Sequence, residues 1–439
     1  MTREVEVSGQ YVKHRKAPVL DGKPRCTLDA TCCGEEVQVG LSDFQLEKGI
    51  ALIGAPGTGK STAMSSILRQ LRMGMTDQDI LFIFDPKGDF RKDLSKEGDI
   101  FLGCGSGGRA PNVRWSLFKE ATAGCRTQGE VDVRVRTIAQ RLIPHENIQT
   151  PIFTDGPRQA CAALIDTFLH CPQLLPAGQL TNEAFLHFVA QMDFRTVIYA
   201  SKRYKGLLRD LLGETGRVNV TQQSHRMEVL VNTNLVLEGF NRAVEAKAPL
   251  FSVVQAEKER GGRVVFLQLD MASSGLQSEC CGLLVDLLIG AALDSSKRQG
   301  MVYLGLDELP QLGKPTIDAV QKAAAVGRDK GICLITAFQS LSQLEEICGQ
   351  EASAALMNNL QTSFHFRTSD GSTKRRVQAL CGRIRTREDH FTPVGLQVGT
   401  VTETDSIRDD ELLGLETGQA VFVTPEKTAC LLHLKNYGR

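Results

Sequence analysis

The sequence predicts an α/β protein in which helices flank a mainly parallel sheet and an all-α domain is inserted. An apolar strand at residues 50–54 leads into a glycine-rich loop, a helix and a second apolar strand at residues 80–84, which is a βαβ unit. Two further apolar runs, residues 302–306 and 332–338, have the composition of buried parallel strands. Over 200 residues separate the second strand from the third, far more than one βα connection needs.

Periodicity suggests how the chain is divided. The first fifty residues alternate short apolar stretches with turn signals, which is typical of a small β-rich element. Between residue 112 and about residue 249 the apolar positions recur at helical spacing, with few β-branched runs. We therefore expect a β-rich element and the first part of the α/β domain in residues 1–111, an inserted all-α domain in residues 112–249, and the second part of the α/β domain in residues 250–439.

Composition limits the classes of function. The 439 residues are 42% apolar, which is ample for a core, and 51 basic residues balance 51 acidic ones. A neutral chain is not held to nucleic acid or membrane by bulk charge, so any such contact must be local. The longest apolar run, residues 287–293, is too short to span a bilayer, and thirteen cysteines without a CxxC pair favour neither disulfides nor zinc. We expect a soluble, cytoplasmic protein.

The glycine-rich loop carries the strongest motif. GAPGTGKS fits GxxxxGK[ST] and lies between a predicted strand and a predicted helix, the context that supports a phosphate-binding loop. Its glycines let successive backbone N–H groups point at phosphates, and the helix N-terminus adds partial positive charge. Lys60 would reach the β- and γ-phosphates of ATP, and Ser61 would ligate Mg²⁺. The expected nucleotide-binding residues are Gly54, Ala55, Pro56, Gly57, Thr58, Gly59, Lys60, Ser61 and Thr62.

An acidic pair follows the third apolar strand. Asp307 and Glu308 come directly after residues 302–306, at the end of a strand where ligands bind in open α/β sheets. Hydrolysis needs an acid that positions magnesium and a group that orients water. We assign Asp307 to magnesium, through water, and Glu308 to the attacking water.

Three further side chains are candidates for the same site. Gln339 follows the strand at residues 332–338 and is a candidate γ-phosphate sensor. Arg328 would end a helix, either as a finger that reaches the γ-phosphate of a neighbouring subunit or as a surface ion pair. Asp85, in the segment DPKGD, follows the second strand, where a nucleotide contact and a simple turn are both consistent with the sequence.

These motifs resemble those of the type IV secretion coupling proteins of the TraD/TrwB branch. The similarity covers nearly the whole chain and includes GAPGTGKS, DPKGD, NVRWSLFKE, LDELPQLGK, GRDKGICLITAFQSLSQLEEICG and NNLQTSFHFRTSD. The resemblance implies a RecA-like motor domain with an inserted all-α domain, ATP and Mg²⁺ between the subunits of a homo-hexameric ring, and DNA in the central channel. On that pattern the roles argued above fall to Lys60, Ser61, Asp307, Glu308, Arg328 and Gln339.

One feature departs from that family. Most of its members begin with a transmembrane pair, which this sequence lacks. Either a separate protein anchors the chain at the inner membrane, or the chain is a soluble relative or a piece of a longer protein. A relaxase and a secretion channel are the partners that the resemblance implies.

Few aromatic residues favour DNA contacts through phosphates. The candidate basic residues are Lys202, Arg203, Lys205, Arg209, Lys374, Arg375, Arg376, Arg383, Arg385 and Arg387. The leading hypothesis is an ATP-driven DNA translocase for conjugative transfer. One alternative is an FtsK/HerA-like or viral genome-packaging motor. The other is an adaptor that recruits secreted substrates and whose assembly is controlled by nucleotide binding.

Overall fold

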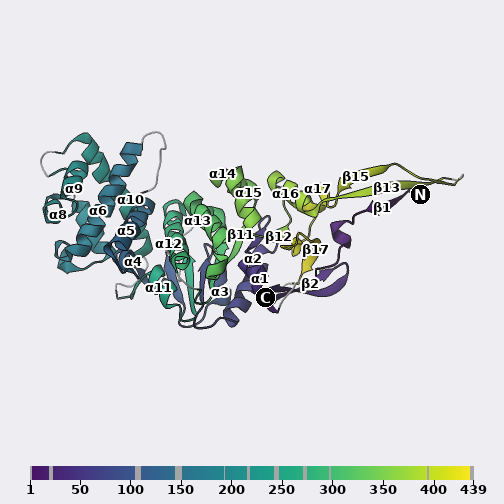
Figure 1. Ribbon diagram of the computed structural model, residues 1–439, viewed down its shortest axis with the longest axis horizontal. Coiled ribbons are helices and arrows are strands. Elements are labelled where there is room, and N and C mark those ends of the chain that lie inside the picture. Colours follow the sequence, from purple (N-terminus) through teal and green to yellow (C-terminus); the bar gives the residue numbers. More distant parts are fainter. Residues whose placement is uncertain are drawn as a thin grey trace. The chain divides into compact units, whose positions relative to one another are not determined.

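The computed structural model comprises two compact units (Figure 1). Unit 1 comprises Met1–Phe84, Asp89–Ser95 and Ser295–Arg439, and unit 2 comprises Asp85–Gly88 and Lys96–Asp294. The structure describes residues 2–18, 23–103, 110–143, 151–191, 193–214, 218–241, 247–269, 274–295, 298–392 and 395–435. In these ranges no helix is long and apolar enough to cross a membrane.

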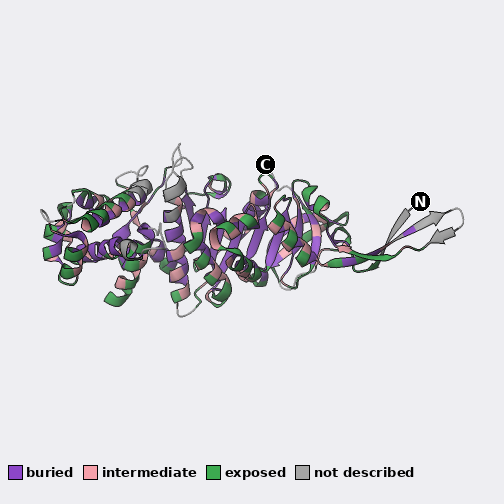
Figure 2. Ribbon diagram, turned by 90° about the horizontal axis from the view of Figure 1, so that it is seen from above, coloured by how far each residue is buried: buried purple, intermediate pink, exposed green. Residues whose placement is uncertain are grey.

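The core of unit 1 is a parallel sheet whose strands run in the order β12-β4-β11-β10-β5. These strands are β4 (Ile50–Ile53), β5 (Ile80–Phe84), β10 (Val302–Asp307), β11 (Ile332–Phe338) and β12 (Thr362–Phe366). Every residue of the five is buried, as the apolar runs predict for strands covered on both faces (Figure 2). Because all five strands run the same way, their carboxyl ends lie at one edge of the sheet.

Antiparallel strands extend this sheet beyond β12. The added strands are, in spatial order, β16 (Gln419–Val423), β17 (Ala429–Leu434), β2 (Pro24–Cys32) and β3 (Glu35–Ser42). A separate antiparallel sheet pairs β13 (Arg383–Thr392) with β1 (Thr2–Ser8), β14 (Gly395–Gln397) and β15 (Val401–Asp405). In the predicted β-rich N-terminus, β2 and β3 therefore pair with each other, while β1 and β2 also pair with strands from the other end of the chain.

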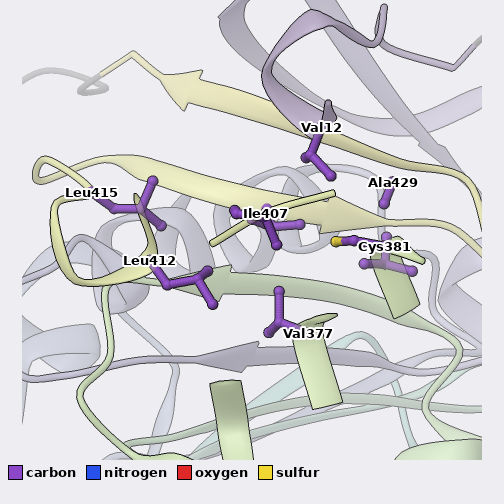
Figure 3. Packing of buried hydrophobic residues seen from close by; sticks show 9 residues of the cluster. Val12, Val377, Cys381, Ile407, Leu412, Leu415 and Ala429 are labelled. Carbon is purple, nitrogen blue, oxygen red and sulfur yellow. The ribbon is translucent and has the colours of Figure 1, made fainter. Parts of the chain in front are cut away.

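The helices of unit 1 are α1 (Asp43–Glu47), α2 (Lys60–Met73), α3 (Asp89–Leu94), α13 (Gly313–Val326), α14 (Leu341–Cys348), α15 (Gln350–Asn359), α16 (Gly371–Cys381) and α17 (Asp409–Leu413). One apolar cluster joins α16 and α17 to β16, β17 and the N-terminal segment (Figure 3). Its members are Val12, Val377, Cys381, Ile407, Leu412, Leu415, Val421, Val423 and Ala429. This packing joins the two ends of the chain within one unit.

Unit 2 is mainly helical. Its helices are α4 (Leu117–Thr122), α5 (Gln128–Leu142), α6 (Pro151–His170), α7 (Asn182–Gln191), α8 (Arg195–Ala200), α9 (Lys205–Leu212), α10 (Val220–Asn241), α11 (Val253–Glu259) and α12 (Ser274–Asp294). The short strands β7 (Arg114–Trp115) and β8 (Leu250–Phe251) pair in parallel. The helical region predicted for residues 112–249 thus begins and ends beside this two-stranded ladder, while its status as a separate domain stays a prediction.

A buried carboxylate reinforces the same junction. Glu120 accepts hydrogen bonds at 2.8–2.9 Å from Trp115 Nε1, Ser252 Oγ and the backbone N–H groups of Val253 and Val254. Burial raises the pKa of Glu120, and these four donors act in the opposite direction. The side chain therefore ties the start of the helical region to its end, 132 to 134 residues apart in sequence, by satisfying the first N–H groups of α11.

None of the four strands that the structure describes in unit 2 was predicted. β6 (Ile100–Gly103) and β9 (Arg263–Gln268) pair in parallel, with β9 largely buried. The apolar run Val264–Leu267 has the composition of a buried strand and is a signal from which β9 could be predicted. β6 is only four residues long, and a run of that length does not distinguish a strand from other buried segments.

Candidate nucleotide-binding site

The predicted phosphate-binding loop connects β4 to α2 at the carboxyl edge of the sheet. Gly54 has φ 155°, and a Cβ there would lie 2.7 Å from Phe366 Cβ, so only glycine fits against β12. Gly59 has φ 108° and precedes the first residue of α2. These two positions need glycine for different reasons, close packing and a left-handed backbone.

The loop is anchored by backbone groups distant in sequence. The N–H of Gly54 donates to Phe338 O at 3.3 Å, and the N–H of Ala55 donates to Arg367 O at 2.9 Å. On the other side, the N–H of Gly418 donates to Thr58 O at 2.9 Å. The sequence analysis did not predict the roles of Arg367 and Gly418, because a hydrogen bond made by the backbone leaves no side-chain motif. The one available signal was that Gly418 is a glycine directly before the apolar strand β16.

Lys60 is placed as the motif predicts. It is the first residue of α2 and is buried, and its Nζ donates to Gly54 O at 2.5 Å and to Ala55 O at 3.0 Å. Ser61 and Thr62 follow in the first turn, where the backbone N–H groups have no partner within the helix. An ammonium group and a helix N-terminus therefore meet in one loop, an arrangement that suits the phosphates of a nucleotide.

The acidic pair lies at the same edge. Asp307 ends β10, in register with Ala337 of β11, and both Asp307 and Glu308 are buried. Glu308 has φ 58° and ψ 54°, a left-handed conformation that costs a non-glycine residue about 1–2 kcal/mol. Strained backbone of this kind persists where the surrounding structure holds a functional side chain in place.

Gln339 contacts Glu308 directly. Its Nε2 donates to Glu308 Oε2 at 3.1 Å, across the ends of the neighbouring strands β10 and β11. The strand order places β11 between β10 and β4, the strand that enters the phosphate-binding loop. The structure thus brings together the loop, the acidic pair and the candidate sensor within unit 1.

The strained backbone of Glu308 gives a testable expectation. Glu308→Gly should be more stable than Glu308→Ala by about 1 kcal/mol, because both lose the side chain and only alanine keeps the left-handed strain. The midpoints of thermal unfolding of the two variants show which of them is more stable. As a control of opposite sign, Lys322→Gly in the exposed part of α13 should be less stable than Lys322→Ala. A more stable alanine variant at position 308 would contradict the argument.

The other two candidates are placed differently: Arg328 lies at the opposite edge of the sheet, and Asp85 directly follows β5. Arg328 comes four residues before the start of β11, at the amino edge of the sheet, whereas Gln339 follows its end. Seven residues of strand separate these edges by roughly 20 Å. Asp85 is buried and belongs to unit 2, where its N–H donates to Leu267 O at 2.8 Å. Its nucleotide contact stays a prediction.

Half of the predicted basic side chains are already paired with carboxylates. Five of the ten side chains face a carboxylate within 4 Å: Arg203 contacts Asp132 and Asp166, Arg209 contacts Glu214, Lys374 contacts Asp409, Arg383 contacts Asp405 and Glu403, and Arg387 contacts Asp389. Such pairs neutralise much of the positive charge that phosphate contacts would use. DNA binding by these clusters stays a prediction.

The residues at the carboxyl edge fit a nucleotide with magnesium. Three loop glycines have positive φ, the Lys60 ammonium is inside the loop, and two carboxylates end the neighbouring strand. Ser61 and Asp307 offer the oxygen ligands that Mg²⁺ prefers. Among the described residues there is no separate cluster of three or more histidine, cysteine or acidic side chains that could hold a metal ion.

The chain matches one protein family over most of its length. The family is described as the type IV secretion-system coupling protein DNA-binding domain, and the match spans residues 38–433. No curated protein sequence matches the chain significantly.

Solved structures are similar at low sequence identity. The plasmid coupling protein TrwB in complex with ADP and Mg²⁺ is 16% identical, with a TM-score of 0.69 over 99% of this chain and 94% of that chain. The unbound bacterial conjugative coupling protein TrwBdeltaN70 is 18% identical, with a TM-score of 0.67 over 99% and 93%. VirB4 of Thermoanaerobacter pseudethanolicus is 14% identical, with a TM-score of 0.57 over 96% and 98%. These likenesses confirm the predicted RecA-like α/β fold.

Proposed function

The chain belongs to the type IV secretion-system coupling protein family by its DNA-binding domain, and on that basis we propose that it is an ATP-driven DNA translocase. The observation that carries the ATPase is the hydrogen bond between Gln339 and Glu308 at the edge that holds the phosphate-binding loop. Glu308 is buried and has a polar partner, and these two properties favour a water-orienting role for it over a place in a solvated turn. The family match favours a coupling protein over a genome-packaging motor.

Each residue at the edge has a role in hydrolysis. The loop N–H groups and Lys60 bind the phosphates of ATP, as the related TrwB binds ADP with Mg²⁺. Ser61 and Asp307 would hold Mg²⁺, and the bound ion would supply neutralisation of phosphate charge. Glu308 orients the attacking water and accepts its proton. Gln339 holds the Glu308 carboxylate and is positioned to report the γ-phosphate.

The site is completed by a neighbouring copy in a homo-hexameric ring. Arg328 lies at the opposite edge of the sheet from its own phosphate-binding loop, roughly 20 Å away along β11. An arginine in that position serves the nucleotide of an adjacent subunit, where it stabilises the charge that develops in the transition state. DNA passes through the centre of the ring, and a relaxase or a secretion channel is its partner there.

DNA should stimulate the ATPase activity, with little preference among sequences. Six phosphate contacts would lower the affinity about a thousandfold between 50 and 200 mM salt, since each contact releases counterions. ATPase rates measured against DNA concentration at several salt concentrations test this, with Lys60→Ala as the control for contaminating activity. A rate indifferent to DNA would favour the adaptor, and a salt-independent, sequence-specific response would indicate base readout.

A further inference from the structure

The side chain of Arg328 contacts a short helix at the amino edge of the sheet. Its Nε lies 3.5 Å from Glu47 Oε2, and its Cζ lies 5.5 Å from the centre of the Phe44 ring; both residues belong to α1. The Arg328 side chain is nevertheless 51% exposed. In the described part of the chain no further hydrogen bond or ion pair engages its two terminal amino groups.

Glu47 is held firmly enough to serve as a support. Its carboxylate, 12% exposed, also accepts a hydrogen bond at 2.8 Å from Arg298 Nη1. Leu46, the residue before it, is fully buried, and Ser42 and Gln45 form a capping box at the start of α1. The helix is thereby fixed by its cap and its buried side chain, and the hydrogen bond from Arg298 holds the Glu47 carboxylate.

The contacts leave Arg328 available to a second ligand. Arg298 Nη1 lies 2.8 Å from the Glu47 carboxylate, whereas Arg328 Nε lies 3.5 Å from it. Arg298 therefore supplies most of the positive charge that neutralises Glu47. Glu47 approaches Arg328 at Nε, and the Phe44 ring supports the guanidinium by a cation–π contact. A guanidinium restrained in this way keeps the paired terminal N–H groups with which arginine binds phosphate.

We propose that Glu47 and Phe44 are positioning residues that orient Arg328 toward the nucleotide of a neighbouring copy of this chain. The inference rests on the proposed ring with Arg328 acting between subunits. Without these contacts a flexible arginine would lose its rotamer freedom at every turnover. With them, the guanidinium is already oriented when the transition state forms. The amino edge of unit 1 is then part of the catalytic interface, although it lies far from its own loop.

Single substitutions test the positioning role. Glu47→Gln should lower kcat for ATP about 10- to 100-fold, the effect of misplacing a catalytic group, and leave KM within about twofold, because the nucleotide-binding loop is untouched. Phe44→Leu should lower kcat severalfold, and Phe44→Tyr, which keeps the ring, should restore it. The matched control is Asp43→Asn on the same helix, which breaks an exposed pair with Arg25 and should leave kcat unchanged.

Mixed rings distinguish positioning from general damage. Rings of Glu47→Gln with Glu308→Gln subunits should regain activity, because some interfaces combine an intact loop site with an intact Arg328. Rings of Glu47→Gln with Arg328→Ala subunits should not, since both defects lie on the same side of every interface. Recovery in the second mixture but not in the first would assign Glu47 to its own subunit's site and overturn the proposal.

The outcomes also separate this inference from the proposed function. If Arg328→Ala hydrolyses ATP at the wild-type rate, the finger itself is wrong and the positioning role fails with it. If Arg328→Ala is impaired while Glu47→Gln and Phe44→Leu are as active as the wild type, only the positioning role fails. A faster Glu47→Gln variant would make Glu47 a competitor for Arg328 and would likewise overturn the proposal.

Discussion

Replacing Glu308 by glutamine is expected to lower kcat for ATP hydrolysis about 10²- to 10⁴-fold, the usual contribution of a positioned base, while ATP still binds. Glutamine keeps the size of the side chain and can still contact Gln339, but it cannot accept a proton from water. Steady-state ATPase rates and the affinity for a fluorescent ATP analogue, measured on the same preparation, check both halves of the expectation.

Lys60→Ala supplies the contrasting phenotype. Its ammonium is buried inside the loop, so alanine removes a phosphate contact and should weaken nucleotide binding itself. The two variants thus separate binding from chemistry at one edge of the sheet. A Glu308→Gln protein that turns over ATP at the wild-type rate would remove the assignment of the water-orienting residue.

Arg328→Ala is expected to lower hydrolysis by about a thousandfold or more, the contribution of an arginine finger. The loss should occur although Arg328 lies at the sheet edge opposite its own loop and half of its side chain is exposed. A surface ion pair with Glu47 alone contributes little to stability, so the thermal midpoint should hardly change. Rates and unfolding midpoints measured together distinguish the two roles.

Mixing two inactive variants tests whether Arg328 acts between subunits. In rings of Arg328→Ala with Glu308→Gln subunits, some interfaces join an intact Glu308 to an intact Arg328, and partial activity should return. Because the finger contributes so much to the rate, even a small fraction of intact sites is measurable above background. No recovery despite confirmed co-assembly would indicate that hydrolysis must pass in sequence around the whole ring.

Local patterns in the sequence were sufficient for the elements of the core. The strands β4, β5, β10 and β11 and the helix α2 occur where apolar runs and a glycine-rich loop predicted them. Each of these signals is contained in a short segment: a run of apolar side chains suits a buried strand, and GxxxxGK[ST] suits a loop before a helix. The identity of Lys60 and of the acidic pair followed from the same local context.

Contacts between distant segments could not be predicted in this way. The contact between Glu308 and Gln339 depends on the register of β10 with β11, and the hydrogen bond from Gly418 to the loop joins residues 360 positions apart. Strand register and backbone hydrogen bonds of this kind are set when the sheet assembles. Many different side chains at these positions would allow the same register and the same backbone hydrogen bonds. No composition or spacing rule therefore reveals them.

The sequence by itself determined which chemical groups the nucleotide site can use, because strand, loop and helix are encoded within a few residues of one another. The tertiary structure alone decided how those groups are held: Glu308 in a left-handed backbone against Gln339, and Arg328 at the opposite edge against Glu47 and Phe44. The physical reason is that parallel strands place side chains at one edge or the other by direction and register, and these are properties of the assembled sheet.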